Sequence, residues 1–285
     1  MSVLRGFDFH NVFLIIRKEI RDSLRNKWFV IYTLSLTLLA VLLVHIGYTR
    51  GSLIEYRGYG RTAASLINLI LLFIPLIALI TGSISLSGER ENGTLAYLLS
   101  HPVSKIEIFI GKYFGILISI TVAVFLSFGL AGFLIYIKGT DESGVNYMLT
   151  AFLSVLLAAS LLSMGFLISV FNYKVSKSIS IGILVWFVFL IVGDLGIIGA
   201  STVLNLGIKE VFYLTIVNPL EAYKITSILM LTPRFEVLGP PGIYALNNLG
   251  RTNLSILLIL IQVAWVVFPM LFSMIHFYYL RREEI

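Results

Sequence analysis

Asp194 is the residue whose chemistry is hardest to reconcile with its surroundings. It is the only charged residue between Ser178 and Ile208, a stretch otherwise apolar or small. An ionised aspartate at the centre of a membrane helix costs roughly 2.5–3.5 kcal/mol on insertion scales, so such a residue usually faces a cavity, a partner or a functional path. We expect Asp194 to line a transport pathway or its gate. The alternative is a protonated or hydrogen-bonded packing residue near the membrane interface.

Metal and nucleophilic chemistry find little support in the sequence. There is no cysteine, which excludes disulfides, thiolate ligands and cysteine nucleophiles. The four histidines are scattered without metal-site spacing, and no G-x-S-x-G turn occurs. Met270, Met274 and His276 suggest a Cu(I) site, but methionine is an ordinary packing residue and His276 projects away from the pair at helical spacing. We therefore predict no catalytic residue and no metal site.

Nucleotide hydrolysis by this chain is also unsupported. The sequence lacks a G-x-x-x-x-G-K-[ST] loop, whose backbone amides and lysine would hold the phosphates of a nucleotide. We therefore expect this chain to bind no cofactor of its own. If its work depends on ATP, then ATP and Mg²⁺ must be bound by a separate ATPase chain.

The elements that position these residues are predicted to be membrane-spanning helices. The chain is 58% hydrophobic and 13% charged, and a helix needs about 20 mostly apolar residues to cross the hydrocarbon core. Six windows meet this requirement, so we predict an all-α polytopic fold. The spans are residues 28–48, 63–87, 110–137, 146–172, 178–204 and 253–280, within a transmembrane domain covering residues 28–280.

The distribution of lysine and arginine predicts the orientation. An even number of spans places both termini on one side. Thirteen Lys and Arg residues fall on that side and eight on the other, which indicates cytoplasmic termini, including a short tail at residues 281–285. We expect no cleavable signal peptide, because the first apolar run follows a long charged segment. The net charge of +6 fits this topology and anionic lipid rather than nucleic acid.

Residues 1–27 form a separate amphipathic segment. Apolar residues from Phe9 to Leu24 share one arc of a helix, whereas the other arc is basic. The segment is therefore expected to lie in the membrane interface. A topogenic anchor and a docking role are both compatible with it. Its basic residues include Arg17, Lys18, Arg21 and Arg25.

Two further segments lie between the spans. Glu89 to Ser100 is predicted to form a short helix stopped by Pro102, and Ser104 and Glu107 form a capping box that restarts a helix. We expect a helical elbow in the cytosol, with its first helix at residues 89–101. Residues 205–250 contain apolar runs too short to cross a membrane and are expected to form short external helices that dip into the outer leaflet.

The order of these parts resembles the type-2 ABC exporter permeases. The resemblance is closer to the NosY-type permeases, which are associated with maturation of nitrous oxide reductase. The E-x-E-x-G-T-L-x-x-L-L-S-x-P-x-S run is the most specific feature of the broad family. The matching segments are RKEIRDSLRNKWF (Arg17–Phe29), IPLIALI (Ile74–Ile80), GERENGTLAYLLSHPVSKIEIFIGKYFG (Gly88–Gly115), VWFVFLIVGDLGI (Val185–Ile197) and VNPLEAYKI (Val217–Ile225).

The resemblance implies a type V ABC exporter-like fold and assigns roles to several segments. The elbow would be the coupling helix that seats on the ATPase, the N-terminal segment an interfacial connecting helix, and residues 205–250 external re-entrant helices. Asp194 would lie near the homodimer axis. The coupling residues would be Glu89, Arg90, Glu91, Gly93, Thr94 and Leu95, and the external gate candidates Asn218, Pro219 and Glu221.

The resemblance also implies partners and a class of cargo. The partners are a second copy of this chain, two copies of an ATPase, and a periplasmic or extracellular accessory protein, in a prokaryotic cytoplasmic membrane. Because no ladder of copper ligands crosses the spans, export of a sulfur species or work on the accessory protein is favoured over copper transport. The alternatives are a lipid, drug or surface-assembly cargo, and an ion-coupled secondary transporter that uses Asp194.

Overall fold

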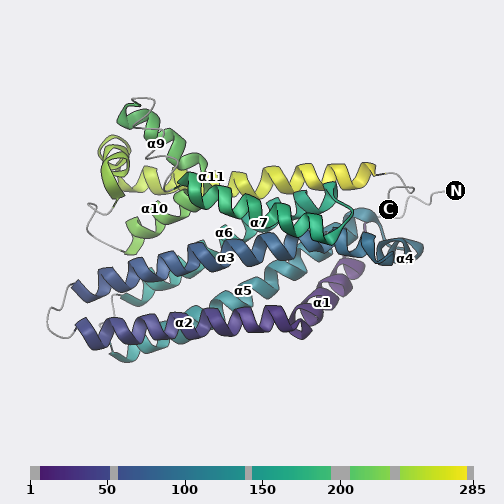
Figure 1. Ribbon diagram of the computed structural model, residues 1–285, viewed down its shortest axis with the longest axis horizontal. Helices are drawn as coiled ribbons and strands as arrows, with labels where there is room; N and C mark the ends of the chain where they lie inside the picture. The colour runs from purple at the N-terminus through teal and green to yellow at the C-terminus, as the bar shows by residue number, and fades with distance from the viewer. Residues whose placement is uncertain (1–6, 52–56, 139–142, 194–205, 232–237, 281–285) are drawn as a thin grey trace.

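The protein is built from α-helices throughout the residues that the computed structural model describes. These residues are 7–51, 57–138, 143–193, 206–231 and 238–280. Figure 1 shows long helices running roughly side by side, with shorter helices at both ends. The helices are α1 (Phe9–Arg25), α2 (Lys27–Gly51), α3 (Arg57–Glu91), α4 (Thr94–Ser100), α5 (Lys105–Lys138), α6 (Ser143–Phe171), α7 (Val175–Ile191), α9 (Ile208–Val217), α10 (Pro219–Leu231) and α11 (Gly239–Tyr279).

Five of these helices are long and apolar enough to cross a membrane. The predicted fifth span, residues 178–204, differs from the structure, because α7 begins at Val175 and its α-helical part has 17 residues. Asp194 and the rest of that span lie outside the described residues. The structure therefore confirms the all-helical fold but not the six complete crossings. The five spans are Lys27–Ile46, Ala64–Glu91, Lys105–Leu134, Met148–Phe171 and Pro241–Tyr279.

Helices α3 and α6 meet backbone to backbone in the core. A Cβ atom built on Gly165 would lie 2.8 Å from the Leu79 carbonyl oxygen and 2.9 Å from the Gly82 Cα atom. A Cβ atom on Gly182 of α7 would lie 2.8 Å from the Ser83 hydroxyl. Glycine at these positions lets helices pack more closely than any side chain would allow. The segment of α3 from Leu79 to Ser83 therefore packs tightly between α6 and α7.

In the stretch at residues 205–250, which the sequence predicts to be external, the described residues form short helices and the start of α11. Helices α9 and α10 are followed by the first turns of α11, which bends at Gly250, where φ is +75°. Beyond the bend, the Arg251 guanidinium donates to the Leu229 carbonyl near the end of α10. A cation at a helix C-terminus satisfies free carbonyls and complements the helix dipole. This contact fixes α10 to the start of the last long helix.

The two ends of the molecule are formed by different helices. Figure 1 shows α1, α4 and the C-terminal end of α11 at one end, and α9 and α10 at the opposite end. Lys105, at the start of α5, donates to the Tyr278 carbonyl in the last turn of α11 over 3.4 Å. The N-terminal helix, the elbow and the end of the last helix therefore form one connected region.

Candidate functional site

The elbow is made of two helices that meet at a glycine. Helix α3 continues to Glu91, and Gly93 then adopts a left-handed conformation with φ of +69° before α4 begins at Thr94. The Gly93 amide donates to the Arg90 carbonyl over 3.1 Å. A glycine in this conformation commonly ends a helix. The predicted single helix over residues 89–101 was therefore wrong in its bounds, since its first three residues belong to α3.

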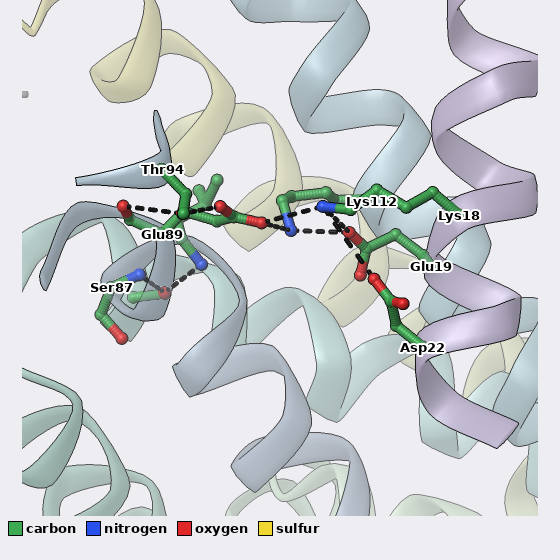
Figure 2. Close-up of polar contacts among 9 residues, drawn as sticks. Lys18, Glu19, Asp22, Ser87, Glu89, Thr94 and Lys112 are labelled. Carbon is green, nitrogen blue, oxygen red and sulfur yellow. Dashed lines mark hydrogen bonds and ion pairs between the residues drawn. The ribbon is translucent and has the colours of Figure 1, made fainter. Parts of the chain in front are cut away.

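A buried lysine joins three helices at the elbow. Lys112 of α5 has a side chain only 4% exposed, and its ammonium lies 2.7 Å from Glu19 Oε1 and 2.9 Å from Glu89 Oε1. Half-exposed Lys18 lies 3.3 Å from the same Glu89 oxygen, and the Thr94 hydroxyl donates to the other. Figure 2 shows this chain of contacts running from α1 through Lys112 to the end of α3. A buried charge needs such partners, because leaving it unpaired is costly.

Two glycines of α5 bring the N-terminal helix close enough for this contact. A Cβ atom on Gly111 would lie 2.7 Å from the Ile15 Cβ atom, and one on Gly115 would lie 2.6 Å from the Glu19 Cβ atom. Gly111 and Gly115 are four residues apart and share one face of α5. The G-x-x-x-G spacing therefore lets α1 rest directly on α5, with Lys112 beside the crossing.

Arg90 binds the end of α6. Its Nη1 atom donates to the Val170 carbonyl over 2.9 Å, and its guanidinium carbon lies 5.5 Å from the centre of the Tyr173 ring. Arg90 is buried. The last carbonyls of a helix lack intrahelical partners, so a cation there stabilises the helix terminus. Arg90 consequently joins the C-terminal end of α3 to the end of α6.

Glu91 binds the start of α7. Its Oε2 atom accepts a hydrogen bond of 2.6 Å from the Val175 amide, the first residue of that helix. A carboxylate at a helix N-terminus satisfies a free amide and complements the helix dipole. Glu89, Arg90 and Glu91 thus connect the end of α3 to α5 and α1, to α6, and to α7 in turn. Glu91 remains exposed while it makes this contact, and the predicted coupling of these residues to an ATPase stays a prediction.

The capping box at the start of α5 is confirmed and has a second role. Ser104 N–H donates to Glu107 Oε2 over 2.9 Å, and Glu107 N–H donates to the Ser104 hydroxyl over 3.2 Å. Glu107 also accepts hydrogen bonds from the Asp8 amide over 2.8 Å and from Asn11 Nδ2 over 3.3 Å. The carboxylate of Glu107 therefore fastens the first turn of α1 to the first turn of α5.

The predicted amphipathic helix exists, but its apolar arc is divided. Val12 is buried against α5, whereas Phe9 and Phe13 are exposed. Arg17 and Arg21, further along the helix, are exposed as well, and Arg25 is exposed in the last turn. One face of α1 thus packs on the protein, and a second face offers aromatic rings and cations to the surroundings, as an interfacial helix requires.

The residues proposed from the sequence as an external gate lie at the junction of α9 and α10. Asn218 Nδ2 donates to the Phe189 carbonyl over 2.7 Å, and its Oδ1 accepts from the Leu220 amide over 3.0 Å. Asn218 is therefore the N-cap of α10, which begins at Pro219. Glu221 is buried and lies 3.3 Å from the Lys224 ammonium. This junction holds α10 rather than opening freely to solvent.

The end of α7 packs against that junction. A Cβ atom on Gly193 would lie 2.9 Å from both Asn218 Nδ2 and Glu221 Oε1. Gly193 therefore allows close approach, and the next residue, Asp194, lies outside the described part of the chain.

In α11, His276 stacks on Phe171 with ring centres 4.3 Å apart. Met270 and Met274 pack partly buried against the core.

The fold and the site together define a class of protein. The chain is a multi-pass helical membrane protein whose helices are joined, at one end, by a charged elbow. Residues 13–283 match the family model described as ABC-2 family transporter protein, and the chain belongs to this family. It is therefore a permease component of an ABC transporter, in which the ATPase is a separate subunit.

Two relatives narrow the comparison. The chain is 30% identical over 226 residues to "Probable ABC transporter permease protein NosY" of Stutzerimonas stutzeri. The aligned region covers 77% of this chain and 82% of that protein. It is 29% identical over 225 residues to the protein of the same name in Pseudomonas aeruginosa, covering 76% of this chain and 81% of that protein. The resemblance to NosY-type permeases predicted from the sequence is confirmed.

Proposed function

We propose that the elbow formed by the end of α3, α4 and the start of α5 is the point at which the ATPase subunit drives the permease. The observation that carries this proposal is the set of contacts made by Glu89, Arg90 and Glu91. These neighbouring residues connect α3 to α1, α5, α6 and α7. A displacement of the elbow would consequently move several helices together, because packed helices shift as rigid bodies.

The assembly that follows from this proposal has two copies of the permease and two of the ATPase. ATP and Mg²⁺ are bound by the ATPase, and both termini and the elbow face the cytoplasm. Helices α9 and α10 then lie at the external end, where an accessory protein would bind. The arrangement is supported by the position of α1, α4 and the end of α11 together, opposite α9 and α10 (Figure 1).

We propose that the permease serves maturation of the copper site of nitrous oxide reductase. It either exports a sulfur-containing species or exerts mechanical work on an accessory protein. The similarity to NosY-type permeases supports this assignment. The packing of Met270 and Met274 and the stacking of His276 favour structural roles for these residues over copper transfer. Sulfur export therefore fits the chain better than transport of copper ions.

The cargo can be tested by complementation in a strain whose own NosY-type permease has been deleted. We expect this chain, expressed with its cognate ATPase, to restore assembly of the copper–sulfide centre in nitrous oxide reductase. A variant ATPase unable to hydrolyse ATP should restore nothing. Assembly of the centre would be followed by its absorption spectrum and by copper and sulfide analysis of the purified reductase.

Two outcomes of this experiment would contradict the proposal, the first its cargo and the second its energy source. The first is a chain that reaches the membrane and binds its ATPase but leaves the reductase without its copper–sulfide centre. Such a chain transports another cargo, and translocation of lipid would be measured next. The second is restoration without ATP hydrolysis, which would favour ion-coupled transport instead.

A further inference from the structure

The outward side of the elbow carries no Asp, Glu, Lys or Arg between Glu91 and Lys105. The three charges before this segment bind α5, α6 and α7, as described above. The exposed residues of the segment are small or polar, with one large exception, Tyr97. They are Asn92, Gly93, Thr94, Ala96, Tyr97, Ser100, His101, Pro102 and Ser104. A partner that contacts this segment therefore meets no Asp, Glu, Lys or Arg side chain beyond the exposed Glu91 at its start.

Tyr97 projects from the centre of this surface. Its side chain is 67% exposed, whereas Leu95, on the opposite side of α4, is fully buried. The ring of Tyr97 meets the ring of His101 edge to face, with centres 5.0 Å apart. Leu98 and Leu99 pack against the core and hold the short helix in place. An exposed tyrosine held in position loses little side-chain entropy on binding, which suits it to anchor a protein interface.

Lipid is the competing occupant for an exposed tyrosine at this end of the molecule. A surface with the composition expected at a lipid interface is found on α1. This helix exposes the rings of Phe9 and Phe13 and, further along, the cations of Arg17 and Arg21. Such a combination of apolar rings and cations is typical of helices at an anionic membrane surface. The exposed side of α4 has one ring pair and no cation. Its chemistry fits a protein pocket better than a lipid surface.

We infer that α4 docks on the ATPase through Tyr97 and His101, which enter an uncharged, aromatic-accepting pocket, and not through ion pairs. This inference rests on the proposed function, in which the ATPase binds the elbow. It adds the chemistry of the contact: an aromatic anchor surrounded by small polar residues of the permease. Glu89, Arg90 and Glu91 contact α5, α6 and α7 of the permease itself and so position α4 for this contact.

The inference is tested by measuring binding of the cognate ATPase to the full-length permease in lipid nanodiscs. Tyr97→Ala should weaken binding by about tenfold or more, as expected for an aromatic hot spot. Tyr97→Phe keeps the ring and should bind within about threefold of the original chain. The matched control is Tyr279→Ala, because Tyr279 is also exposed and also meets a neighbouring ring, that of Tyr278, at the same end of the molecule. This control should leave binding unchanged.

The salt dependence of the same binding supplies a second readout. An interface of ion pairs weakens steeply as salt rises, whereas an uncharged aromatic contact changes little. We expect the affinity to vary less than about threefold from low to high salt. If Tyr97→Ala binds like the original chain, or if salt abolishes binding, the aromatic anchor is rejected while ATPase docking stands. If the original chain fails to bind the ATPase at all, the proposed function itself fails.

Discussion

Replacing Lys112 with methionine is expected to destabilise the permease by about 3 kcal/mol and to abolish most ATP-driven transport. The substitution keeps an apolar stem of similar length but removes the buried cation that lies between Glu19 and Glu89. Breaking a buried ion pair by removing one partner typically costs about 3–5 kcal/mol. The lower end of this range applies here, because Lys18 remains 3.3 Å from Glu89.

The measurement is thermal unfolding of the purified permease together with transport per ATP hydrolysed in vesicles. Lys18→Met is the matched control, since the Lys18 side chain is 47% exposed and exposed ion pairs contribute about 1 kcal/mol or less. Adding Glu19→Gln to Lys112→Met removes the charge of one of the two carboxylates that contacted Lys112. The double variant should therefore recover part of the stability. Equal losses in the Lys112 and Lys18 variants would contradict the assigned role of the buried lysine.

Gly165→Val is expected to separate α3 from α6 and to lower stability by about 1–3 kcal/mol, the usual cost of overpacking. A side chain at Gly165 would meet the Leu79 carbonyl and the Gly82 backbone, which are parts of a helix and cannot rotate away. The effect should appear as a lower Tm and a smaller yield of folded protein in detergent. Expression and Tm equal to those of the original chain would show that the two helices do not touch here.

Gly129→Ala provides the control for this experiment. Gly129 lies in α5, and a Cβ atom built there meets no other atom within 4 Å. Replacing a helical glycine with alanine where space is free should leave stability unchanged or raise it by about 0.5–1 kcal/mol. The contrast between the two substitutions separates the loss of a close helix contact from any general effect of replacing glycine.

The fold was predictable to the extent that it depends on local composition. Charge-free apolar windows identified α2, α3, α5, α6 and α11, because a membrane helix satisfies its own backbone. The same rule predicted a span at residues 178–204, of which the structure describes only the part up to residue 193, including α7 to Ile191. The bend at Gly250 was also not predicted, since a glycine in a polar stretch gives no sign of its φ angle.

The elbow between two helices could be predicted from its motif, but the contacts within it could not. Glu89, Arg90 and Glu91 are three consecutive charged residues at a predicted turn. Their contacts with α5, α6 and α7 depend on the packing of segments that are distant in sequence. Glu19 and Lys112 were not recognised at all. Lys112 lies inside the predicted span at residues 110–137 and is the only charged residue between Glu107 and Lys138. The G-x-x-x-G spacing of Gly111 and Gly115 around it was the available signal for a close helix crossing.

The most direct test of ATPase docking at the elbow is labelling of a single thiol on α4. Because the chain has no cysteine, Ala96→Cys places one thiol on the exposed side of this helix. In vesicles of known orientation, a membrane-impermeant maleimide should react with it only from the cytoplasmic side, and the cognate ATPase should slow the reaction strongly. Labelling from the external side, or a rate that the bound ATPase leaves unchanged, would contradict the proposal that the elbow receives the work of ATP hydrolysis.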